Sequence, residues 1–253
     1  MLRCSNLNTA SGATQGKTRA LEATLQIRGD NAQIPGQAQL FTLEASGHVA
    51  HEWAGMELLS LLFLLGVGIH WLNSQGQRQR TALLAEHLRP YQIEKHMAQL
   101  TEAYMRALSE PEAARQQQIL QLQEVAEQQL AEEFKAVATE FGRLAAPVTR
   151  GFKIALPFID QLSPKTTFDM RRLLVVHAQG IGRAIALTPE AAKERSFRIM
   201  AEMFLMQHSC HWFCKSKTIA SARMLRQHQT RYEQALEAVS PETRQAYLAV
   251  VQG

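Results

Sequence analysis

The most apolar stretch of the chain is AGMELLSLLFLLGVGIHWLNS, near the end of its first third. Its centre, Leu58 to Ile69, is interrupted only by Ser60 and two glycines. Extended to 54–73, it reaches the roughly 20 residues that an α-helix needs to cross a bilayer. Trp53 and Trp71 stand near its two ends, where indole rings favour the headgroup boundary. The pattern predicts one transmembrane helix over 54–73, with a buried core helix and a cleaved signal segment as alternatives.

The flanks of this segment predict its orientation. No lysine or arginine lies between Gln33 and Gly55, whereas Arg78, Arg80 and Arg89 follow closely. Basic residues beside a membrane helix stay cytoplasmic, so we expect a single-pass protein of the cell inner membrane with its C-terminal part in the cytoplasm. No small-x-small site follows promptly, which argues against cleavage as a signal.

The segment before the apolar stretch has a different character. Residues 1–53 begin with a Ser/Thr/Gly/Asn-rich run, and only TLQI and QLFTL look like strands. We expect 1–53 to be disordered, or to be a leader outside the translated protein. Met56 opens the apolar run, and in a bacterial gene the codons of Glu52 to Gly55 would form a purine-rich run just upstream. The hypothesis is that translation starts at Met56, which N-terminal sequencing would test.

Beyond Gly76 the apolar positions recur with a period of about 3.6, and strand-like alternation is absent. Ser163, Thr188 and Ser240 each precede a proline, and Ser109 with Glu112 has the spacing of a capping box; both patterns mark helix starts. The predicted helices are 78–108 with a bend near Pro90, 110–145, 151–161, 165–187, 189–236 and 241–251. We therefore expect an all-α fold, in which 78–253 forms an antiparallel helical bundle on a single N-terminal membrane helix. The Gln-rich run within 110–145 could instead self-associate as a coiled coil, although it keeps no strict heptad.

Charge is distributed unevenly although the net charge is only +4. Segment 110–143 holds seven glutamates, whereas 203–232 holds no acidic residue. The two segments could complement each other when packed, or the basic one could face an external anionic surface. On one straight helix over 189–236, its basic residues flank an apolar face. They form the predicted partner or lipid surface: Lys215, Lys217, Arg223, Arg226 and Arg231.

The run HSCHWFC, residues 208–214, concentrates soft ligands. Cys210, His211 and Cys214 could share a metal ion, but His208 lies well round the helix from the cysteines and no second Cys/His cluster exists. We therefore expect buried structural side chains, with no metal and no cofactor. The three cysteines lack the spacing of a disulfide framework, which favours a reducing compartment.

The phrase GIGRAIAL, Gly180 to Leu187, resembles the glycine-rich turn of short-chain dehydrogenases over eight residues. The resemblance implies nucleotide binding, but Val176 stands where that family has an earlier glycine. A tight helix crossing at Gly180 and Gly182 is the preferred interpretation. No nucleophile–base constellation or phosphate loop stands out, so we expect no enzyme activity.

These patterns favour a membrane-anchored, non-enzymatic helical protein that binds a protein partner or acts as a scaffold, with possible contact to anionic lipid. The alternative is a soluble helical regulator that buries 58–72 and lays the basic face, Lys215 to Arg231, on nucleic acid. No helix-turn-helix spacing supports that alternative, so a nucleic-acid partner is not expected.

Overall fold

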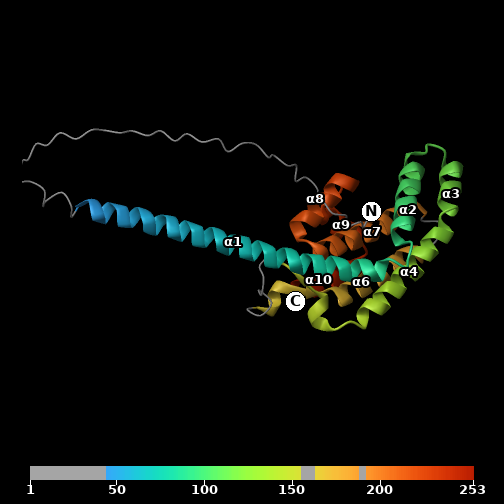
Figure 1. Ribbon diagram of the computed structural model, residues 1–253. Coiled ribbons are helices and arrows are strands. Elements are labelled where there is room, and N and C mark those ends of the chain that lie inside the picture. The colour runs from blue at the N-terminus through green and yellow to red at the C-terminus, as the bar shows by residue number, and fades with distance from the viewer. Residues whose placement is uncertain (1–43, 155–162, 188–191) are drawn as a thin grey trace, which may run out of the picture. The chain divides into compact units, whose positions relative to one another are not determined.

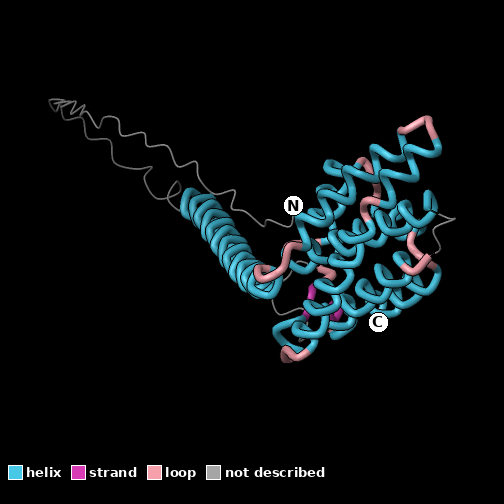
Figure 2. The backbone as a smooth tube through the Cα atoms, turned by 90° about the vertical axis from the view of Figure 1, so that its right-hand side faces the viewer, coloured by secondary structure: helices cyan, strands magenta, loops and turns pink. Residues whose placement is uncertain are grey.

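A computed structural model describes residues 44–154, 163–187 and 192–253 (Figure 1). This part of the chain is mostly helical, as expected, with one short two-stranded hairpin (Figure 2). It falls into two compact units that divide between Gly68 and Ile69.

The helix α1 (Glu44–Leu88) contains the apolar stretch. Residues 44–53 belong to this helix, while TLQI and QLFTL lie outside the described residues. In the described part of the chain, α1 is the one helix long and apolar enough to cross a membrane, and its apolar window from Glu57 is 0% buried. Its exposed large side chains are Leu58, Leu59, Leu61, Leu62, Phe63, Leu64, Leu65, Val67, Trp71 and Leu72.

Two predicted helices are each divided. The bend near Pro90 is a complete break, since α1 ends at Leu88 and α2 (Ile93–Ser109) follows. The helix expected over 110–145 is α3 (Ala113–Gln121) and α4 (Glu124–Gly142).

The predicted capping box at Ser109 is wrong. Ser109 ends α2 and its hydroxyl donates to the carbonyl of Arg106 (2.9 Å), while Glu112 caps α3 without a side-chain bond. At the break after α3, Leu122 is 69% exposed.

The hairpin was not predicted. The strands β1 (Arg150–Phe152) and β2 (Thr167–Asp169) pair antiparallel, with Gly151 opposite Phe168. A Cβ on Gly151 would lie 2.2 Å from the Phe168 ring, so the ring requires glycine there. The helix expected over 151–161 thus begins as a strand, and 155–162 lie outside the described residues.

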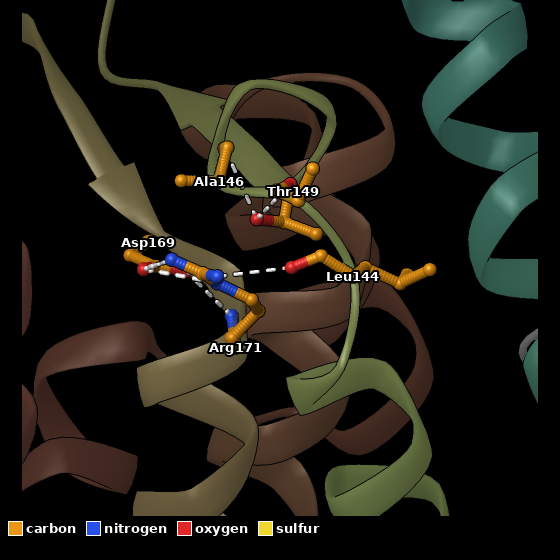
Figure 3. A network of polar contacts seen from close by, with 6 residues as sticks. Leu144, Ala146, Thr149, Asp169 and Arg171 are labelled. Atoms are coloured by element: carbon orange, nitrogen blue, oxygen red, sulfur yellow. Dashed lines mark hydrogen bonds and ion pairs between the residues drawn. The ribbon is translucent and has the colours of Figure 1, made fainter.

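A polar joint holds the hairpin against the start of α6 (Met170–Ile185) (Figure 3). Asp169 caps α6 by accepting from the Arg171 amide (2.9 Å), and its carboxylate also pairs with the Arg171 guanidinium (2.7 Å). The same guanidinium donates to the carbonyl of Leu144 (2.9 Å), while Thr149 closes the 3-10 turn Ala146–Thr149. The helix expected from 165 therefore begins only at Met170, after the 3-10 turn Pro164–Thr166 and β2.

The long helix expected over 189–236 is three helices: α7 (Ala192–Cys214), α8 (Lys217–His228) and α9 (Tyr232–Ala238). Ser216 starts α8 by accepting from the Ile219 amide (3.3 Å), and Gln229 ends it with a left-handed φ of 54°. The cap expected at Ser240 is confirmed, since its hydroxyl accepts from the Thr243 amide (3.1 Å) at the start of α10 (Pro241–Gln252). The start expected at Thr188 lies outside the described residues.

The helix α7 occupies the centre of the folded domain. Every residue from Ile199 to Cys214 is buried, because α6, α8, α9, α2 and β1 all pack on it. The apolar stripe predicted for this helix is therefore part of a surface buried all round. Polar side chains on α7 must find partners inside the protein.

Candidate functional site

The predicted basic residues gather around α8 rather than along one long helix. We call Lys215, Lys217, Arg223, Arg226 and Arg231 the basic surface. Lys217, Arg226 and Arg231 are exposed, and the other two are half-buried. Because the chain breaks after Cys214 and at Gln229, the predicted arrangement on two margins of one apolar face is wrong.

Two members of the basic surface help to hold α8 in place. Lys217 Nζ lies 4.4 Å from the ring centroid of Tyr232 and 5.6 Å from that of Trp212. Arg223 Nη1 donates to His211 Nδ1 (3.4 Å). Lys215, Arg226 and Arg231 show no side-chain hydrogen bond or cation–π contact of this kind among the described residues.

The acidic segment finds its partners elsewhere. Among the described residues, no member of the basic surface forms an ion pair with a carboxylate. Glu127 of α4 instead pairs with Arg195 of α7 inside the protein and accepts from the Tyr104 hydroxyl (2.5 Å). Burial and the adjacent Glu127 raise the pKa of Tyr104, which therefore stays protonated.

A buried histidine lies beneath the basic surface. His208 Nε2 and Ser221 Oγ are 3.0 Å apart, and the His208 ring centroid lies 4.6 Å from that of Tyr232. Burial, with Lys217 and His211 nearby, lowers the pKa of His208 to about 3. His208 Nδ1 has no hydrogen-bond partner among the described residues, so no third group orients the ring. The neutral pair joins α7 to α8.

A second histidine–serine pair lies deeper. Ser209 Oγ donates to the carbonyl of Leu205 (2.9 Å), so His177 Nε2, at 2.8 Å, must donate to Ser209 Oγ. Burial, assisted by His208, lowers the pKa of His177 to about 3. This neutral pair joins α6 to α7. No sequence pattern predicts this pair, since 32 positions separate its members.

A buried carboxylate joins α6, α7 and α10. Glu202 accepts from the Ser240 amide (3.3 Å), and Thr243 Oγ1 accepts from Arg183 Nη2 (2.8 Å). Burial raises the pKa of Glu202 to about 7, although Thr243, Ser240 and nearby arginines act in the opposite sense. A Cβ on Gly180 would lie 2.3 Å from Glu202 Oε2. This glycine of the GIGRAIAL run therefore lies at a close crossing of α6 and α7.

The crossing predicted at Gly182 is wrong. A Cβ there would have no neighbour within 4 Å among the described residues, and Gly182 is exposed.

The three soft ligands predicted on α7 do come together. Cys210, His211 and Cys214 line one wall of a cavity of about 20 Å³, opposite Thr81 and Leu84 of α1. The space suits a single water molecule. In the described ranges, no group of three or more His, Cys, Asp and Glu side chains is placed to hold a metal ion. Both thiols are buried. That they bind no metal stays a prediction.

An apolar groove lies between α2, α7 and α9, and no sequence pattern predicted it. Its volume is about 480 Å³, and His228 stacks on Phe204 at its end, with ring centroids 4.0 Å apart. Met105 and Phe197 are 60% and 52% exposed on its edges. Its main lining residues are Met105, Phe197, Met200, Phe204, His228 and Gln234.

Comparison of the chain with protein-family models, with curated proteins and with solved structures gave no match. The candidate functional features among the described residues are the basic surface, the groove and the buried polar side chains of α6 and α7.

Proposed function

We propose that this chain is a single-pass membrane protein whose cytoplasmic domain, an antiparallel helical bundle, binds a protein partner without catalysing a reaction. The observation that carries the proposal is the exposed apolar run of α1 from Leu58 to Leu72. Ten large apolar side chains there face outward, each between 39% and 70% exposed.

The free-energy cost of exposing these apolar side chains to water supports the anchor. Burying one large aliphatic or aromatic side chain is worth roughly 1.5–3 kcal/mol, so ten in water forgo a large stabilisation that bilayer hydrocarbon would provide. Gly66 and Gly68 have open space around them, which suits a helix surrounded by lipid chains. The positive charges at Arg78, Arg80 and Arg89 favour a cytoplasmic domain.

The groove supports a protein partner. Contiguous exposed apolar side chains commonly mark interaction sites, and Met105 and Phe197 project at the edges of this one. Glutamines and His228 along the groove add polar groups that could fix the register of a bound segment. The polar clusters of α7, by contrast, lie inside the protein, where a substrate has no access.

The alternative is a soluble regulator that binds nucleic acid through the basic surface. It requires residues 58–72 to form part of a core, whereas their side chains are exposed. Arg226 and Arg231 would suit phosphate groups, so the alternative keeps one supporting feature.

Membrane extraction separates the two functions. We expect the native protein to stay in the membrane pellet after high salt and after alkaline carbonate, and to dissolve only in detergent. A Phe63→Lys and Leu64→Lys double variant should lose retention, whereas Met105→Lys in the groove should retain it. Release of the unaltered protein by carbonate alone would contradict the anchor.

Partner binding needs a second measurement. After cross-linking in membranes, Phe197→Glu should lose a partner band that Val125→Glu keeps, because Val125 is also apolar and exposed (68%, against 52% for Phe197) but lies outside the groove. Equal bands from the two variants would show that the groove is not the partner site.

A further inference from the structure

The outward face of α8 combines aliphatic and basic side chains. Ile219 is 42% exposed and Leu225 is 50% exposed. At 100° per residue, these two stand about 120° apart with exposed Ala222 midway between them. The inner face is firmly docked, since Ala220 and Met224 are buried in the core. The aliphatic residues are therefore held outward by the packing of the opposite face.

Positive charge surrounds this aliphatic arc. Arg226 lies about 40° from Ala222 on the same face, and Lys215 and Arg231 stand just before and just after α8. The whole stretch 203–232 contains no acidic residue. Long basic side chains can lay their methylene stems along apolar surface while the charged ends reach outward. An anionic surface with an apolar layer behind it matches this arrangement.

We propose that α8 is an interfacial helix that rests on an anionic bilayer, with Ile219 and Leu225 between the headgroups and Lys215, Arg226 and Arg231 at the phosphates. The inference rests on the proposed membrane anchor, which would keep the domain close to the lipid surface. The docked inner face means that the whole domain, rather than a loose helix, makes the contact.

A bilayer fits this face better than nucleic acid does. The phosphates of a nucleic acid would bind the three basic side chains, but a sugar–phosphate chain would give the two exposed aliphatic side chains no apolar surface to contact. Helices that lie in the membrane interface show the combination found here, with basic residues beside aliphatic ones on one surface. Attraction to anionic lipid is screened by salt, which gives a measurable signature.

The test uses the full chain with Cys4→Ser and Ala222→Cys, carrying an environment-sensitive dye on the new thiol. It is reconstituted into vesicles of phosphatidylcholine, with or without phosphatidylglycerol. The matched control carries the dye at Ala114→Cys, an exposed alanine on α3. We expect a blue shift at position 222 on anionic vesicles alone, reversed by high salt, and no shift at position 114.

Two variants assign the contact to the named side chains. Arg226→Glu with Arg231→Glu should reduce the fraction of dye in the apolar environment at least tenfold, and Leu225→Ser should reduce the shift several-fold. Val125→Ser, an exposed aliphatic on α4, should leave it unchanged. Identical emission at 222 and 114 on anionic vesicles, or equal shifts at 222 on neutral and anionic lipid, would overturn the proposal.

The anchor is measured separately in the same vesicles by flotation after carbonate treatment. A chain that floats but shows no shift at 222 keeps its anchor and loses the α8 contact. A shift at 222 on adding a short DNA duplex to the detergent-solubilised protein, with none on anionic vesicles, would assign the face to nucleic acid and overturn the lipid contact.

Discussion

Gly180 has no side chain where the Glu202 carboxylate and the Thr243 hydroxyl occupy the space that a Cβ would need, at 2.3 and 2.7 Å. Gly182, one half-turn further along α6, faces open space. The two glycines therefore offer a matched pair, since one is required by packing and the other only lowers helix propensity.

Gly180→Ala should destabilise the domain by about 1–3 kcal/mol, because the new methyl group must displace buried polar atoms. Gly182→Ala should stabilise it by about 0.5–1 kcal/mol through helix propensity. Denaturant unfolding followed by circular dichroism in detergent measures both changes. Equal effects of the two substitutions would show that the close crossing at Gly180 does not exist.

At the scale of elements, the buried carboxylate of α7 makes the packing of α6, α7 and α10 depend on pH. Burial raises the pKa of Glu202 to about 7 in the folded domain, above the ordinary value of 4.5. Between these values the folded state holds a proton that the unfolded chain has lost. The stability that the protonated carboxyl provides is therefore complete below pH 4.5 and is lost as the pH rises through 7.

Relative to the unaltered protein, the free energy of unfolding of Glu202→Gln should therefore rise by about 1–3 kcal/mol as the pH increases from 5 to 8.5, since the amide does not ionise. His177 and His208 titrate alike in both proteins, so the difference isolates Glu202. Glu237→Gln, on the exposed surface of α9, controls for the loss of one negative charge. A pH-independent difference between Glu202→Gln and the unaltered protein would contradict the prediction.

The sequence predicted the helical class and the Ser240 cap because both depend on local signals. The end of α8 was missed because Gln229 takes a left-handed conformation that usually favours glycine. The strands β1 and β2 are three residues long, too short to show alternation. The surroundings of His177 and His208 depend on which helices cover α7, which no pattern within α7 specifies.

At the scale of the whole molecule, the end of α1 is part of the folded domain. Arg80 donates to the carbonyl of Phe213 at the C-terminal end of α7 (2.8 Å) and lies over the Phe152 ring, 4.8 Å from its centroid. One turn later, Leu84 is 3% exposed and belongs to the core. A fragment that starts after α1 would leave both interactions unmade.

A fragment of residues 90–253 should therefore be less stable than one of residues 76–253 by on the order of 4 kcal/mol. The estimate combines the loss of a buried leucine with that of one charged hydrogen bond. Denaturant unfolding of the two purified fragments gives the comparison. Matching midpoints would mean that the end of α1 contributes nothing to the domain.

Under the proposed membrane anchor, the continuity of α1 links release of the domain to its stability. A protease that cut between Leu88 and Ile93 would separate the domain from Arg80 and Leu84 as well as from the apolar run. Release would then also lower the stability of the domain, so the liberated domain would unfold more often and be degraded faster. The released domain would therefore have a shorter lifetime than the attached one.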